Sequence, residues 1–411
     1  MGTFYVNSGS GNDGTGAEDN PAQPFKTIGA ALAVANTSGD IVEITDQETY
    51  FESSNISPRL LINANNVTIT HTGSFSLGRP KIDAGGQAYV FDLDGKTDIT
   101  LNGLHLTNVI NSALQDNDGA GLTVTDCFFE NVPKFGNAHL AGTVSKPARI
   151  KQSAFMFQGG GGGNIPLTNN GVVEIENCFF SASNNGDHIM RSYQLSATAS
   201  FCTFIHQDYE PGNSFSVVNW GKVVNCVITA STTNGINPTS IKGLQANEHS
   251  NNLVHVAGTS FLTYGGSNST PGADDITVAP TFVDGTSKGN TFSVVQNYAL
   301  AEGSRGIDEG VTFNSINVDI IGTSRPQNAG FDMGAFETVV PYWTDADGHG
   351  ECEIKFKPDF VICHTANKLY ERRFPINKDN RQAPYSVTVA GPSTIRERGT
   401  AYKIDGSEGN G

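Results

Sequence analysis

A short alternation of apolar and polar residues recurs through the middle of the chain, and its strongest copies share a cysteine near their end. Consecutive cysteines lie 51, 24 and 24 residues apart, and the long gap contains another copy with serine at the cysteine position. Weaker copies extend the series at both ends, with steps of 23 to 26 residues. The repeated position, here named the cysteine column, comprises Leu104, Cys127, Ser153, Cys178, Cys202, Cys226 and Asn252. Such an internal repeat is the sequence signature of a solenoid.

Each copy predicts short strands. In the copy at 173–180 the alternation places Val173, Ile175, Cys178 and Phe180 on the inside of a coil. An Asp or Asn directly before the column suits a bend between two strands, because its side chain can hydrogen-bond nearby backbone. Strands that recur about every 24 residues without helices stack in parallel, coil upon coil. The pattern therefore predicts an all-β parallel solenoid over residues 59–340.

The first 58 residues predict a terminal strand, a capping helix and a first coil. Residues 4–6 and 41–44 alternate as strands. Between them, Ile28, Ala31, Leu32 and Ala35 fall on one face of a short helix, with Thr27 as its N-cap. A helix at this position would cover the open apolar end of the solenoid.

The last 71 residues differ in composition and predict a separate small β module. Residues 341–411 contain ten basic and ten acidic side chains, so the net charge of −16 belongs to residues 1–340. Strand-like segments around Lys357-Pro358-Asp359 predict a hairpin that places Cys352 opposite Cys363. A disulfide, two free thiols and a zinc site with His349 and His364 are the three alternatives. We expect the module to serve attachment or oligomerisation.

Both ends of the repeat region carry motifs that resemble those of right-handed parallel β-helix proteins of the pectate-lyase-like superfamily. The matching positions are Asn20-Pro21, Pro24–Ile28, Gly39-Asp40, Ile307-Asp308, Arg325-Pro326 and Asp332–Glu337. The resemblance covers about residues 3–340 and implies a right-handed parallel β-helix. It does not select one function, because the fold occurs in lyases, hydrolases, epimerases, phage tailspikes and adhesins. For tailspike-like members it implies a homotrimer.

Charge and hydropathy exclude some partners. A net charge of −16 disfavours nucleic acid and anionic membrane surfaces, whose phosphates would be repelled. No run of 18 apolar residues predicts a membrane span, and the strand at 4–6 follows Met1 too closely for a signal peptide. We expect a location on a virion or an extracellular surface.

The densest cluster of residues capable of chemistry lies between 184 and 210, and Trp220 extends the candidate region to 184–220. Counted from the cysteine column, its members come from neighbouring coils, where they would lie on one flank of the solenoid. Catalysis, ligand contact without catalysis, and an ordinary polar turn are the alternatives. The candidate catalytic residues are Asp187, His188, Asp208 and Glu210, and the candidate ligand-binding residues are Arg191, Tyr193, Tyr209 and Trp220.

Three further sets of residues call for interpretation. Asp345, Asp347 and Glu351 form a partial Ca²⁺ loop, for which a solvated linker is the alternative. No other cofactor is required. The column cysteines are interpreted as packing groups inside a narrow coil. Arg325, with Asp319, Asp332 and Glu337, is interpreted as a structural ion-pair corner that closes the last coil.

Taken together, the sequence predicts a virion- or cell-surface β-helix of the tailspike or head-spike type that binds surface polysaccharide. Its C-terminal module would contact other virion or surface proteins. One alternative is a polysaccharide lyase or glycoside hydrolase that uses the cluster at 184–220. Another is a structural decoration protein without a ligand.

Overall fold

The chain forms two compact units, residues 1–338 and 339–411. The computed structural model describes residues 1–52, 60–71, 78–115, 120–135, 142–158, 167–169, 171–183, 188–192, 197–207, 215–231, 242–255, 261–262, 271–272, 274–284, 295–314, 316–327 and 330–338 of the first unit. In the second unit it describes five strands by their backbone.

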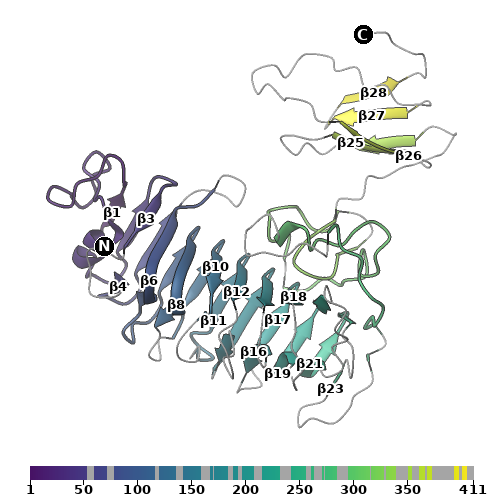
Figure 1. Cartoon of the computed structure of the whole chain (residues 1–411), viewed down its shortest axis with the longest axis horizontal. Helices are drawn as coiled ribbons and strands as arrows, with labels where there is room; N and C mark the ends of the chain where they lie inside the picture. The colour runs from purple at the N-terminus through teal and green to yellow at the C-terminus, as the bar shows by residue number, and fades with distance from the viewer. Residues whose placement is uncertain are drawn as a thin grey trace. The chain divides into compact units, whose positions relative to one another are not determined.

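The first unit is built from two sheets of parallel strands that alternate along the chain (Figure 1). The first sheet has the order β1 (Thr3–Val6), β2 (Ile41–Ile44), β5 (Thr68–His71), β7 (Thr100–Asn102), β9 (Thr123–Thr125), β11 (Ala148–Lys151), β14 (Val173–Glu176), β17 (Thr198–Ser200), β19 (Phe215–Val224), β16 (His188–Ser192) and β13 (Leu167–Asn169), with β21 (Lys242–Ser250) beside β19 and β23 (Phe261–Leu262) beside β21. The second sheet has the order β22 (Leu253–His255), β20 (Val227–Ser231), β18 (Thr203–Gln207), β15 (Phe179–Ser183), β12 (Ala154–Gln158), β10 (Phe128–Val132), β8 (His105–Gln115), β6 (Lys81–Asp92) and β3 (Thr49–Phe51), with β4 (Leu60–Leu61) on β6. Because successive coils pair in parallel, the predicted right-handed parallel β-helix is confirmed.

The predicted capping helix is confirmed as α1 (Ile28–Val34). The Thr27 side chain accepts a hydrogen bond from Ala30 N at the first turn. Ile28, Ala31, Leu32 and Ala35 are all buried, and they pack in the same core as the inner residues of β1 and β2. Within the described parts of the chain, no helix has the length and hydropathy that crossing a membrane would require.

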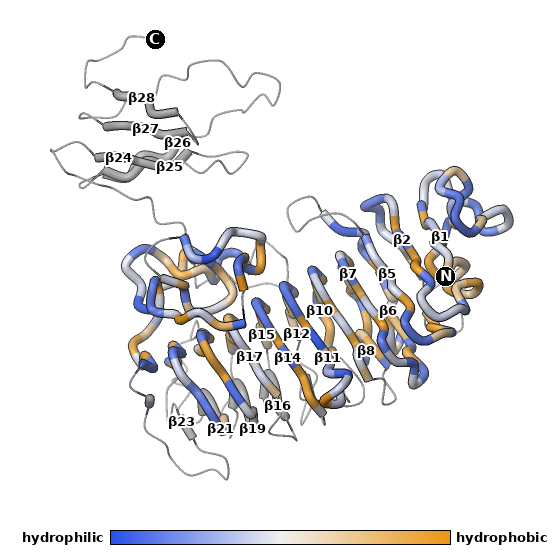
Figure 2. Tube along the Cα trace, turned by 180° about the vertical axis from the view of Figure 1, so that it is seen from behind, coloured by the Kyte–Doolittle hydropathy of each residue, from blue (hydrophilic) through white to orange (hydrophobic). Residues whose placement is uncertain are grey.

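The cysteine column lies inside the β-helix, and its thiols are packing groups, as predicted. Cys127, Cys178, Cys202 and Cys226 are free and fully buried. Burial raises the pKa of Cys127 to about 12, so its thiol stays neutral. Next to the column, the rings of Phe129, Phe155, Phe180 and Phe204 stack with centroid separations of 4.5, 4.8 and 5.1 Å. Alternation of hydropathy along the strands is visible in Figure 2.

The residue directly before the column forms the predicted bend between the two sheets. Its backbone is left-handed in the coils from Asp126 to Asn251, with φ between 47° and 56°. Asn and Asp tolerate this conformation best among residues with a side chain, which explains their recurrence here. Phe201 is an aromatic exception with φ 51°. Its ring lies 4.7 Å from the Arg325 guanidinium and 5.7 Å from the Phe331 ring, so distant residues stabilise it.

Residues 295–338, named the covering segment, contact Phe201 and also pack against other residues on the outside of the coils. The bend side chains bind its backbone in reverse order: Gln152 donates to Asp319 O, Asn177 to Val318 O, Asn225 to Val311 O and Asn251 to Glu309 O. Residues 309–319 of the segment therefore run antiparallel to the stacking direction. Its apolar side chains pack on outward residues of the second sheet, among them Phe128, Met156 and Phe179. This segment and Phe282, which precedes it in the chain, bury these outward residues.

The second unit contains two small sheets. One has the order β24 (Gly350–Glu353), β27 (Ser393–Glu397) and β28 (Thr400–Ile404), and the other pairs β25 (Val361–Thr365) with β26 (Lys368–Arg372). The predicted hairpin between Cys352 and Cys363 is wrong, because Cys352 pairs with Ile395 and Cys363 with Tyr370. β25 pairs instead with the strand that follows it, across a two-residue connection. The side chains of both cysteines lie outside the described residues, so the alternatives for their state stay predictions.

Candidate functional site

The outer face of the second sheet is covered at one end and open at the other. From Phe128 and Met156 onward, its outward side chains are 5% exposed or less beneath the covering segment as far as Val227 and Thr229, whereas His255 on β22 is exposed. On the coils before that point, parallel pairing aligns two outward rows. One row contains Thr49, Lys81, His105 and Phe128, and the other contains Phe51, Asp83, Thr107 and Glu130. This part of the rows carries the polar face, which comprises Phe51, Lys81, Asp83, His105 and Glu130. The side chains of Lys81, His105 and Glu130 are 37%, 20% and 12% exposed, and Thr107 in the same row is buried.

Glu130 is the centre of the polar face. Its Oε2 lies 2.9 Å from His105 Nε2 and 3.3 Å from Lys81 Nζ. These two contacts, the hydrogen bond from His105 above all, lower the pKa of Glu130 to about 2 although burial opposes them. The carboxylate therefore keeps its charge at neutral pH. The His105 ring in turn lies 4.8 Å from the Phe128 ring, at the edge of the covered region.

Asp83 occupies the same outward row as Glu130, with Thr107 between them. Its Oδ1 accepts hydrogen bonds from Gly85 N and Asn108 Nδ2, both at 2.7 Å. Asn108 adopts a left-handed backbone, with φ 57°, where β8 bends next to this contact. Both described bonds fall on one carboxylate oxygen, which leaves Oδ2 as an acceptor that can face solvent.

Phe51 completes the row with an apolar surface. Its side chain is 64% exposed, in contrast to Phe129 and Phe155 inside the coil. An isolated exposed aromatic residue needs no functional explanation. Here, however, the ring lies in register with Asp83 at the end of a row of hydrogen-bonding groups. An aromatic ring beside such groups is the arrangement that binds the apolar face of a sugar ring and its hydroxyls together.

A buried ion pair fixes the polar face from one side. Arg79 precedes β6 and is only 5% exposed at its side chain. Its Nε donates to Asp126 O at 2.6 Å and its Nη2 lies 2.5 Å from Asp126 Oδ1. Asp126 is the bend residue of the coil that carries Glu130, so this contact ties β6, with Lys81 and Asp83, to β10. Burial raises the pKa of Asp126 against the opposing effect of Arg79.

The residues predicted from the cluster at 184–220 lie on another part of the β-helix. His188 and Arg191 are on β16, paired with Phe215 and Val218 of β19, and Trp220 is on β19, paired with Ala246. The register thus brings the strands of His188, Arg191 and Trp220 side by side, while their side chains are not described. Asp187, Tyr193, Asp208, Tyr209 and Glu210 lie outside the described residues, so the catalytic and ligand-binding roles stay predictions.

The calcium prediction is also open. Asp345 and Asp347 lie outside the described residues, and Glu351 is described only as part of the backbone of β24. Among the described residues of the chain, no three His, Cys, Asp or Glu side chains group as metal ligands.

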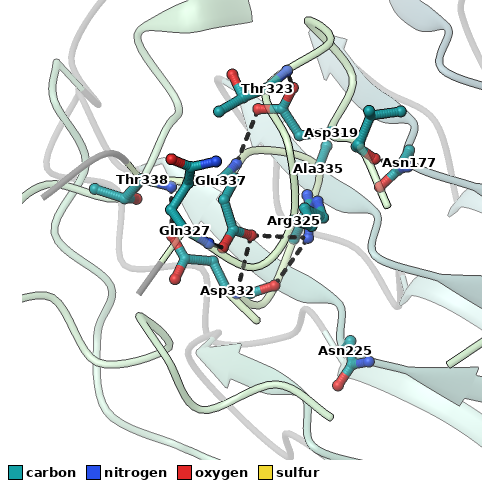
Figure 3. A network of polar contacts seen from close by, with 12 residues as sticks. Asn177, Asn225, Asp319, Thr323, Arg325, Gln327, Asp332, Ala335, Glu337 and Thr338 are labelled. Atoms are coloured by element: carbon teal, nitrogen blue, oxygen red, sulfur yellow. Dashed lines mark hydrogen bonds and ion pairs between the residues drawn. The ribbon is translucent and has the colours of Figure 1, made fainter. Parts of the chain in front are cut away.

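The Arg325 corner is confirmed as a structural ion-pair cluster (Figure 3). The guanidinium is fully buried, donates to Asp332 O and Gly334 O, and lies 3.6 Å from Glu337 Oε2. Its predicted position at the last coil is wrong. The corner lies over the coil that carries β17 and β18, which two further coils follow, and there Arg325 covers Phe201 and Ala335 N donates to Thr203 Oγ1 at 2.9 Å. The covering segment turns back along the axis, which a count of residues along the chain does not show.

Comparison with known proteins adds little to this geometry. No protein-family model matches the chain, and no curated protein matches it significantly. Among solved structures, the chain is similar to pectate lyase Pel9A at 14% identity and a TM-score of 0.46, over 82% of this chain and 96% of that one. It is similar to jun a 1, the major allergen from cedar pollen, at 12% identity and a TM-score of 0.36, over 74% of this chain and 85% of that one. The chemistry of the site must therefore be argued from this chain's own residues.

Proposed function

We propose that the protein binds polysaccharide through the polar face. The observation that carries this proposal is the alignment of an exposed ring, Phe51, with the hydrogen-bonding groups of Lys81, Asp83, His105 and Glu130 on a parallel sheet. Neighbouring strands are about 4.8 Å apart, so the rows present groups at short, regular intervals. A polymer of similar repeating units can contact several of them at once.

Binding suits the polar face better than hydrolysis does. A glycoside hydrolase needs one carboxylic acid that is protonated near neutral pH so that it can donate to the leaving group. Glu130 is held in the opposite state by His105 and Lys81, which lower its pKa to about 2. The hydrolase alternative thus depends on the cluster at 184–220. The charge state of Glu130 does not bear on the lyase alternative, which also uses that cluster, and the side chains of the candidate residues there are not described.

We further propose that the protein acts on a virion or cell surface as a homotrimer, attached through residues 339–411. The support is the separate compact unit at the C-terminus and its neutral composition beside an acidic first unit. A surface protein with a binding face in one unit and an attachment element in the other needs such a division. Mass measurement of the full chain in solution tests the trimer.

A polysaccharide-binding assay on the full chain tests the main proposal. Isothermal titration against a panel of xylan, β-glucan, alginate and polygalacturonate should give binding to at least one polymer. Phe51→Ala should weaken that binding roughly tenfold, equivalent to about 1.4 kcal/mol, while Phe51→Trp should retain it. The thermal midpoint of each variant controls for folding, and an exposed ring should leave it unchanged.

Two controls separate this face from the alternatives. Trp220→Ala changes the other predicted site. If Trp220→Ala loses binding while Phe51→Ala binds fully, the proposal is contradicted and the site lies at β16 and β19. Incubation of each polymer with the protein, followed by measurement of new reducing or unsaturated ends, tests for cleavage. Shortened chains would favour the enzyme alternative.

A further inference from the structure

The basic side chains on and beside the polar face already contact carboxylates of the chain. Lys81 Nζ and His105 Nε2 both contact the single oxygen Glu130 Oε2. At the adjoining bend, Arg79 contacts Asp126 through two of its nitrogens. A polymer carboxylate would have to compete with Glu130 or Asp126 for these groups. Such competition removes a close ion pair to make another, with little net gain.

The remaining charge on the face is negative. Asp83 stands in the open row, and its described partners, Gly85 N and Asn108 Nδ2, are both uncharged. With an unprotonated imidazole, Lys81, Asp83, His105 and Glu130 have a formal sum of −1. The face also belongs to the unit that holds the whole net charge of −16. Both the local and the long-range field therefore repel a polyanion.

From this arrangement we infer that the polar face selects polysaccharides built from sugars without carboxylate groups, and that it excludes polyuronates. The inference rests on the proposed function and names its ligand class. Sugar hydroxyls are hydrogen-bond donors, and the Oδ2 atom of Asp83 offers a carboxylate oxygen as an acceptor for them. The exposed ring of Phe51 contacts the C–H face of a neutral sugar without a charge requirement.

The first experiment uses two polymers that differ only in charge. Polygalacturonate is compared with its carboxyl-reduced form, in which every carboxylate has become a primary alcohol and the linkage is unchanged. Xylan and β-glucan extend the uncharged set, and alginate extends the charged set. At low ionic strength we expect the best uncharged polymer to bind at least tenfold more tightly than either polyuronate. Added salt should reduce this ratio, since it screens repulsion between exposed charges.

The outcomes distinguish this inference from the proposed function. A polyuronate that binds as tightly as every uncharged polymer would overturn the inference and leave the proposed function intact. Failure of all polymers to bind would contradict both. Binding of uncharged polymers with exclusion of polyuronates supports both.

A variant pair assigns the selectivity to this face. Glu130→Gln keeps the shape of the side chain but releases Lys81 and His105 from their carboxylate. We expect it to bring the affinity for polygalacturonate within about threefold of that for the carboxyl-reduced form. Glu174→Gln removes a carboxylate that pairs with Arg149 on the first sheet, at 2.8 Å, and should leave the ratio at its wild-type value. An equal ratio in wild type and Glu130→Gln would overturn the assignment to the polar face.

Discussion

At the scale of single residues, the Arg325 corner gives the first unit a predictable response to pH. Asp319, Asp332 and Glu337 surround one buried guanidinium, and burial raises the pKa of each of these carboxyls. For Glu337 the pKa rises from 4.5 to about 7. Between these two values the unfolded chain loses the proton while the folded chain keeps it, so rising pH favours unfolding.

The prediction concerns the change Glu337→Gln. Wild type should lose stability between pH 5 and pH 7, by about 2 kcal/mol from Glu337 alone. Glu337→Gln should show a smaller loss, because the amide does not ionise in either state. Urea unfolding at both pH values measures the difference. Equal pH dependence of the two proteins would show that Glu337 is ionised in the folded state throughout this range.

At the scale of elements, the contact between the bends and the covering segment stabilises the outer layer. Asn225 Nδ2 donates to Val311 O at 2.7 Å, and Asn225 Oδ1 accepts from Val311 N at 3.0 Å. Asn251 holds the same left-handed bend with one long contact, 3.4 Å from Glu309 O. The two asparagines thus share a backbone conformation but differ in what they bind.

This difference allows a matched test. Glycine adopts the left-handed conformation without strain, so Asn→Gly removes the side-chain bonds and leaves the bend. Asn225→Gly should destabilise the first unit by about 2 kcal/mol, because two partly buried hydrogen bonds to the Val311 backbone are lost. Asn251→Gly should cost less than about 1 kcal/mol. Equal costs in urea unfolding would mean that these hydrogen bonds do not hold the covering segment.

The elements also show how far sequence reasoning reaches. The inner rows, the capping helix and the bends follow from local alternation, which is why the cysteine column and Thr27 were predictable. The covering segment was not, because its partners lie as far as 167 residues away, as with Gln152 and Asp319. One signal was present. In Cys-Phe-Phe, two successive aromatic residues must face opposite sides of a strand, so Phe128 and Phe179 required an outer cover.

The candidate site was missed for a related reason. Phe51, Lys81, Asp83, His105 and Glu130 are spread over 80 residues and form no motif. Counting from the cysteine column nevertheless places two of them on neighbouring coils, because His105 follows Leu104 by one position and Glu130 follows Cys127 by three. The density of polar residues along the chain instead favoured 184–220 as the site. Sparse residues from four strands can make a face that density along the chain does not reveal.

At the scale of the whole molecule, the division after Thr338 predicts that binding and attachment are separable. Thr338 still belongs to the first unit: its N donates to Asp332 Oδ2 at 2.6 Å and its Oγ1 to Leu300 O at 3.2 Å. The polar face and the covering segment both lie before this residue. A chain ending at residue 338 therefore keeps every described contact of the first unit.

We expect the chain of residues 1–338 to unfold at the same temperature as the first transition of the full chain, and to bind polysaccharide with the same affinity per site. If residues 339–411 form the trimer, the shortened chain should be monomeric, and its retention on a surface coated densely with polysaccharide should fall by tenfold or more through loss of multivalency. Sizing with light scattering and binding to a sparse and a dense polysaccharide surface measure these effects. A shortened chain that remains trimeric would place the oligomer contacts on the β-helix itself. One that loses affinity per site would show that the C-terminal unit takes part in binding.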